Sequence, residues 1–251
     1  MELKVKTTWL YLFAVVYPNI ESLALTPARS GSTAVRLGVW AVLVVLLWAG
    51  AAAAVSYTAT VNGSQVTVTY EGNGTEGDPY LINGTNEQML AELQAMNSSD
   101  DRDNHFRLAA DIDAAATQGW NGGEGFHPIQ GWSDGGLNGA NHTIASLTIA
   151  NTTSFERMHG VGLFGRVFGS DFEVSNIRLQ AVNISGTPSN DESGTGALAG
   201  SLEEGGQLSR IEISGDVSGV RNTGGLTGLV NRGSATVSNV TVDVNINDSY
   251  T

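Results

Sequence analysis

The sequence predicts an all-β fold, a right-handed parallel β-helix with a short N-terminal capping helix, and two observations support this prediction. One glycine-bounded motif occurs three times over residues 160–247, and apolar residues alternate with polar ones after each copy. Repeats built from period-two strands and broken by glycine are typical of a stacked solenoid. Right-handed winding is the default for parallel crossovers, so we expect that hand here.

Each repeat opens with a short apolar segment between two glycines, which we expect to be structural. The alternating strand that follows is one residue longer in the first repeat than in the other two, which predicts a bulge or a wider corner. The six structural glycines are Gly162, Gly165, Gly196, Gly200, Gly225 and Gly228. Aligning the repeats also predicts two stacked polar columns that share hydrogen bonds, namely Ser175, Ser209 and Ser238, and beside them Asn176, Arg210 and Asn239.

Residues 58–113 are expected to form the N-terminal strands and the cap of the solenoid. Residues 58–70 alternate as one strand, and residues 80–82 form a second, short one. Thr85 and Gln88 have the spacing of a capping box, which predicts a helix to about Met96 with one buried apolar face. Residues 106–113 return as a strand. A helix here would cover the core of the first coil.

The chain before the β-helix domain, 55–251, divides into two parts. Residues 1–36 form a leader of uncertain structure. Residues 37–54 are apolar and end in small residues, as in the core of a signal peptide, although a transmembrane helix is the alternative. In both cases the rest of the chain is exported, and we expect contact with the membrane only through this segment. The chain ends without a polar cap, which predicts a fragment of a longer protein or a final coil covered by a partner.

Charge excludes several partners. The chain has no cysteine and a formal charge of −13, and both lysines lie in the leader. Beyond Val55, eight arginines face 23 acidic residues, a formal charge of −15. So acidic a body repels nucleic acid and anionic membranes. It predicts a protein kept soluble by carboxylates, such as one from a halophile.

Five short segments occur in an order that resembles the GLUG-repeat family of exported proteins. They are Gly77–Ile82, Leu108–Asp113, Phe126–Ile129, Leu137–Ile144 and Val161–Gly165. Gln130, Phe126 and Leu137–Asn138 depart from the family pattern at turn and core positions. The resemblance implies a parallel β-helix exposed on cell surfaces, often in adhesins. Membership of such a family would not by itself define an activity.

Candidates for chemistry are few. Asp111 and Asp113 lie two apart on a strand and so face the same side, which makes them candidates for calcium or for a cap or turn role. The acidic pairs Glu203–Glu204 and Asp191–Glu192 are expected to be solvated surface. His105, His127, His142 and His159 lack the spacing of a zinc site. We therefore predict no catalytic residue and no cofactor other than calcium.

The sequence also has nine Asn-x-Ser/Thr sequons, which mark potential glycan acceptors in exported chains. Those in turns are the expected sites, whereas Asn141 and Asn239 are expected to be partly buried. The sites expected to be glycosylated are Asn73, Asn83, Asn97 and Asn151.

Three functions remain open at this point. The leading hypothesis is an extracellular or cell-surface module with an adhesin-like or structural role and no enzymatic activity, whose partners are other surface proteins or polysaccharide. The second is a carbohydrate-active enzyme, a polysaccharide lyase or hydrolase, and its cleft would be marked by exposed tryptophans beside carboxylates. The third is a passive spacer within a longer surface protein. The residues to inspect for the enzyme are Trp120, Trp132, Glu124 and Asp134.

Overall fold

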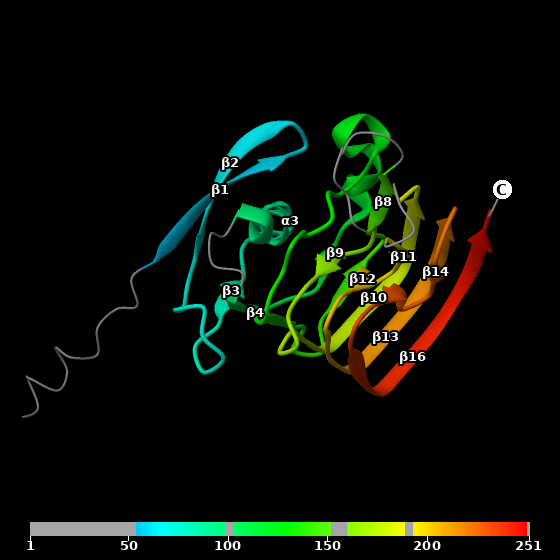
Figure 1. Cartoon of the computed structure of the whole chain (residues 1–251). Coiled ribbons are helices and arrows are strands. Elements are labelled where there is room, and N and C mark those ends of the chain that lie inside the picture. Colours follow the sequence, from blue (N-terminus) through cyan, green and yellow to red (C-terminus); the bar gives the residue numbers. More distant parts are fainter. Residues whose placement is uncertain (1–53, 99–102, 152–159, 189–192, 250–251) are drawn as a thin grey trace, which may run out of the picture. The chain divides into compact units, whose positions relative to one another are not determined.

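The computed structural model describes residues 54–98, 103–151, 160–188 and 193–249, and these form a β-solenoid of about four coils (Figure 1). The leader and most of the apolar segment 37–54 lie outside this description. Among the described residues, no helix is both long enough and apolar enough to span a membrane.

The longest sheet runs through all the coils, with strand order β16-β13-β10-β6-β4-β3. Its three long strands pair in parallel and lie side by side in Figure 1, so that Ile177, Ile211 and Val240 occupy one column. The bounds are β3 Tyr80–Ile82, β4 His105–Leu108, β5 Ile112–Asp113, β6 Gly136–Asn138, β7 Thr143–Ala145, β8 Thr148–Asn151, β10 Glu173–Gly186, β13 Gly205–Gly219 and β16 Ser234–Asp248.

Two smaller parallel sheets complete each coil. One joins β9, β12 and β15, and the other joins β11 and β14. The predicted glycines lie in and beside these strands, where a Cβ atom added at any of the six would come within 2.0–2.5 Å of another atom. At Gly162, Gly196, Gly200 and Gly228 the nearest atoms belong to neighbouring backbones, so close backbone approach requires glycine there, whereas Gly165 and Gly225 face side chains. The bounds are β9 Phe164–Val167, β11 Thr195–Gly196, β12 Ala199–Leu202, β14 Thr223–Gly224 and β15 Thr227–Val230.

The predicted bulge lies in β10. The register between β10 and β13 shifts after Leu179, so Val182 pairs with Gly215, and the two residues Gln180 and Ala181 in β10 lie opposite the single residue Ser214 in β13. Gly215 has φ +136°, and an added Cβ would lie 2.2 Å from the carbonyl oxygen of Val182. The extra residue in the first repeat is thus accommodated by a glycine in the second.

A column of aromatic rings fills the interior at the N-terminal side. Tyr70 packs on Phe106 with ring centroids 5.2 Å apart, Phe106 packs on Trp132 at 5.6 Å, and Trp132 packs on Phe164 at 6.2 Å. Phe172 ends this series. Beyond it, the core consists of aliphatic residues that stack from coil to coil, such as Ile211 and Val217. Stacking of like side chains makes one continuous core.

The cap is built as predicted around helix α3, Asn86–Ala95, with Thr85 as N-cap. The Thr85 N–H donates to Oε1 of Gln88 at 2.7 Å, and a 3₁₀ turn, η2 Met96–Ser98, follows the helix. The helix packs against strands β1, Val55–Val61, and β2, Ser64–Tyr70. Its apolar face is buried at Met89, Leu90 and Leu93.

Two strand predictions were wrong in detail. Residues 58–70 form an antiparallel hairpin, β1 Val55–Val61 and β2 Ser64–Tyr70, rather than one strand. The turn is Asn62-Gly63, and both residues have positive φ, as a tight hairpin turn requires. Residues 106–113 are divided between β4 and β5, and a further 3₁₀ segment, η3 Ala115–Gly123, follows.

The bulge gives a test of the fold. Gly215→Ala is expected to lower the free energy of unfolding by about 2 kcal/mol or more, because the methyl group meets the Val182 backbone at a φ that L-residues avoid. Chemical denaturation measures the change. The control is Gly77→Ala, where no atom lies within 4 Å of the added Cβ and the expected change is below about 0.5 kcal/mol. Equal effects of the two substitutions would contradict the register described here.

Candidate functional site

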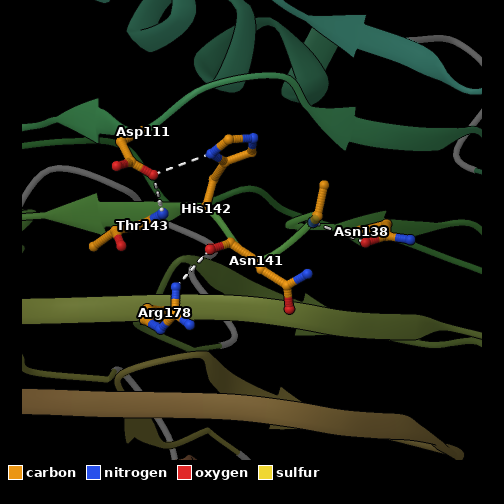
Figure 2. A network of polar contacts seen from close by, with 7 residues as sticks. Asp111, Asn138, Asn141, His142, Thr143 and Arg178 are labelled. Atoms are coloured by element: carbon orange, nitrogen blue, oxygen red, sulfur yellow. Dashed lines mark hydrogen bonds and ion pairs between the residues drawn. The ribbon is translucent and has the colours of Figure 1, made fainter.

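The two predicted calcium ligands are both exposed on the outer side of β5, but local donors engage them. Asp111 Oδ1 accepts the Thr143 N–H at 2.9 Å and lies 3.1 Å from Nδ1 of His142 (Figure 2). Asp113 Oδ1 accepts the N–H of Ala115 at 3.0 Å, which is a turn-capping contact. The Thr143 N–H and the His142 ring hold the pKa of Asp111 below its ordinary value.

No metal cluster is found in the part of the chain that the structure describes, where no three His, Asp or Glu side chains converge. His159 lies outside the described residues. Asp111 and Asp113 accept hydrogen bonds from the backbone N–H groups of Thr143 and Ala115, contacts of the kind that the cap or turn role predicts.

A polar stripe crosses the outer face of the long sheet next to this network. Thr143 pairs with Arg178, Arg178 with Glu212, and Glu212 with Thr241, so one outward position recurs in four successive coils. The second column predicted from the sequence lies beside it. We define the polar stripe as Asn138, Asn141, Thr143, Asn176, Arg178, Arg210, Glu212, Asn239 and Thr241.

The second column has an unusual backbone. Asn176, Arg210 and Asn239 have φ of 54°, 52° and 53°, in the left-handed region. Asn tolerates this conformation, whereas for most other L-residues it costs about 1–2 kcal/mol. Asn176 Nδ2 donates to Oδ1 of Asn138 at 3.1 Å, and Arg210 Nε donates to Oδ1 of Asn176. The predicted exchange of side-chain hydrogen bonds is therefore confirmed between Asn176 and Arg210.

Arg178 connects three coils. Its Nε donates to Glu212 Oε2 at 3.2 Å in the next coil, and Nη1 donates to the Asn141 carbonyl oxygen at 2.5 Å in the previous one (Figure 2). The Arg178 side chain is 47% exposed and that of Glu212 is 65% exposed. Ion pairs this exposed contribute about 1 kcal/mol or less, so the contact positions the guanidinium more than it stabilises the fold.

A groove of about 270 Å³ opens along the stripe between Asn141, Asn176, Arg178, Arg210, Glu212, Asn239 and Thr241. Sequence reasoning identified the Asn176 column but missed Arg178 and Glu212. Continuing the alignment of the repeats two residues beyond Asn176 and Arg210 would have placed Arg178 beside Glu212. That pair would have indicated a charged column.

The tryptophan platform expected for an enzyme is not formed. Trp132 is 0% exposed within the aromatic column and cannot stack on a sugar. Trp120 is half-buried and stacks on Phe126 at 6.4 Å. A bridge between Trp132 and Val167 continues the sheet of β9, β12 and β15 into this segment.

One acidic pair also differs from its prediction. Glu203 is 4% exposed rather than solvated, and it pairs with Arg166 at 3.0 Å. Asn231 Nδ2 also donates to its carboxylate, at 3.3 Å. A buried carboxylate requires such partners. Glu204 is exposed as expected, and the pair Asp191–Glu192 lies outside the described residues.

The sequon asparagines differ in their exposure and in the contacts of their side-chain amides. Asn73 and Asn83 are exposed, and their amides donate to Asp78 at 2.6 Å and to Glu71 at 3.2 Å. Asn97 is half-buried, and its amide both donates to the Pro128 carbonyl oxygen and accepts from the Gln130 N–H. This engagement disfavours a glycan on Asn97. The Asn151 side chain lies outside the described residues. Asn141 and Asn239 were expected to be partly buried, but both are exposed.

Comparison with known proteins identifies a relative that matches part of this chain. No family model matches the chain, so the GLUG resemblance stays a prediction. The chain is 40% identical over 134 residues to halomucin of Haloquadratum walsbyi, and the match covers 50% of this chain and 1% of halomucin. This chain thus spans only a small part of that protein's length.

Among solved structures, the crystal structure of a candidate immunoglobulin A1 protease from Bacteroides ovatus is similar to this chain. The identity is 18%, and the alignment covers 70% of this chain and 69% of that one, with a TM-score of 0.38. A likeness this low carries no argument about function.

The Asp111 network gives a pH-dependent prediction. Asp111→Ala is expected to lower the free energy of unfolding by about 0.5–1 kcal/mol at pH 7, a value reduced for solvent exposure. The folded pKa lies below the unfolded value of about 3.9, so the carboxylate stabilises the fold above that pH and the contribution is lost as pH falls through the folded pKa.

Denaturation at several pH values measures this difference. The gap between wild type and Asp111→Ala should shrink below about pH 4. The matched control is Asp243→Ala on β16, which removes one exposed carboxylate and thus the same formal charge. A gap for Asp111 that persists at acid pH would contradict the assignment.

Proposed function

We propose that this chain is an exported cell-surface β-solenoid module with an adhesin-like binding or structural role and no enzymatic activity. The observation that carries the proposal is the polar stripe, in which the same outward positions recur in register over successive coils. The match to halomucin over half of the chain supports a place at the cell surface.

The spacing of the stripe suits an extended partner. Neighbouring strands lie about 4.8 Å apart, so hydrogen-bonding groups repeat at that interval along the solenoid. A polysaccharide, or an extended segment of another surface protein, would meet similar chemistry at each step. The acidic body favours solubility and disfavours nucleic acid.

The arrangement of the candidate residues supports a binding role over catalysis. A glycosidase needs two free carboxylates about 5–9.5 Å apart across a cleft. Asp111 and Asp113 instead hold backbone N–H groups, and Trp132 is buried. A polysaccharide lyase or hydrolase therefore stays the alternative function, and one experiment can test it together with the binding role.

The proposal predicts two results. Protease treatment of intact cells should digest this protein while leaving a cytosolic marker intact. The purified protein, incubated with a panel of polysaccharides, should release no new reducing ends and no unsaturated products, yet it should bind at least one of them. Protection from protease in intact cells would contradict the surface location, and product release would favour the lyase or hydrolase.

A passive spacer is the second candidate, and the exposed edge of β16 favours it. Val237, Val242 and Ile246 are 50%, 40% and 49% exposed, although their counterparts in β13 are buried. An unpaired apolar strand edge tends to pair with another strand. A further coil of the same kind would cover these side chains and lengthen the solenoid.

The edge predicts concentration-dependent self-association, which sedimentation velocity measures. Val242→Lys places a charge on the inward position of the edge and should abolish association. Thr241→Lys, which adds the same charge at the adjacent outward position, should leave association unchanged. Association that is equally sensitive to both substitutions would show that general charge, and not the apolar edge, drives it.

A further inference from the structure

One residue of the polar stripe departs from the pattern of the repeat. Asn occupies the left-handed position in the coils on either side, at Asn176 and Asn239, but Arg210 occupies it in the coil between them with φ 52°. Asn is the residue that this conformation favours, and it would also extend the amide column. A side chain that its backbone conformation disfavours directs attention to what that side chain can contact.

Arg210 brings a second guanidinium to the groove that Arg178 already lines. The body has eight arginines, so two of them face a single groove of about 270 Å³, together with one carboxylate, Glu212. Within an otherwise strongly acidic chain, this groove has a local excess of positive charge. It therefore favours an anion over a cation.

The hydrogen bonds of the two arginines leave donors available to a ligand. Arg210 uses Nε for Asn176, and Arg178 uses Nε and Nη1 for Glu212 and Asn141. Within the described residues no contact is recorded for either Nη atom of Arg210 or for Nη2 of Arg178. Guanidinium groups bind carboxylates and sulfate-like groups through such paired donors.

The remaining groups in the groove suit hydroxyl groups. The side-chain amides of Asn141 and Asn239 and the hydroxyl of Thr241 can each donate and accept. The Asn176 amide is already engaged by Asn138, Ser175 and Arg210. The groove is close to the lower limit of about 300 Å³ for small-molecule sites, a size that suits one or two sugar rings. It is also open, so a longer chain can extend beyond it.

We propose that this groove binds an anionic saccharide, with Arg210 and Arg178 contacting a carboxylate or sulfate group and the amides contacting ring hydroxyls. The inference deepens the proposed function, because it names a ligand class for the polar stripe. It concerns recognition only, and no bond of the sugar is broken.

The decisive variant is Arg210→Asn, which restores the residue that the repeat uses at this position. This substitution suits the left-handed backbone, so loss of binding cannot be attributed to misfolding. Titration calorimetry with oligogalacturonate and with dextran sulfate should show affinity lowered roughly tenfold or more, equivalent to about 1.4 kcal/mol. Arg178→Gln should weaken binding to a similar degree.

Two controls separate recognition from general charge. Arg107→Gln removes the same charge from an exposed arginine on β4, outside the groove, and should change affinity less than twofold. Neutral dextran should bind much more weakly than either anionic probe. Comparison of the two probes shows whether carboxylate or sulfate is preferred.

Several outcomes would overturn the inference: unchanged affinity in Arg210→Asn, equal loss in Arg107→Gln, equal binding of neutral dextran, or no binding of either anionic probe. These failures are distinct from failure of the proposed function. A protein that is digested on intact cells but binds no anionic saccharide would retain its surface role and lose this ligand. If the protein were found in the cytosol and Arg210→Asn still weakened saccharide binding, the binding site would stand and the surface location would not.

Discussion

The structure depends on parallel stacking in register, in which each inward side chain lies on its counterpart in the next coil. Ile177, Ile211 and Val240 form one such column. A shift of one residue would turn the apolar side chains outward, so the register is fixed by burial. The same register decides the outer surface, since Arg178 and Glu212 come together only because Ile177 and Ile211 do. The core and the polar stripe are thus two results of a single alignment.

Sequence reasoning was most successful where local chemistry and the repeat agree. It predicted the solenoid, the α3 cap from Thr85 and Gln88, the bulge in β10, and the stacked column that includes Asn176. It failed where a tertiary contact decides. Trp132 is buried because a neighbouring coil covers it, and Glu203 is buried because Arg166 lies beside it. No spacing within the sequence shows either partner.

The polar stripe was only half predictable for a related reason. Alternation identifies which residues face outward, but it does not show which outward residues from different coils meet. That requires the pairing of one coil with the next, which sets Arg178 opposite Glu212. The strained position of Arg210 was invisible to composition and periodicity, because only backbone geometry distinguishes it from an ordinary surface arginine. Alignment of the repeats predicted that Arg210 lies beside Asn176. Only its positive φ shows that arginine occupies a backbone position that favours asparagine.

The uneven composition of the core has a mechanical consequence. The aromatic column ends at Phe172, and residues 173–249 contain no aromatic side chain. Coils of a solenoid are held mainly by their nearest neighbours. A pulling force applied at β16 would therefore peel the aliphatic coils one after another, each rupture leaving the next strand as the new edge. Resistance would rise on reaching the aromatic rings and the α3 cap, so the chain would lengthen in steps before the first coil unfolded.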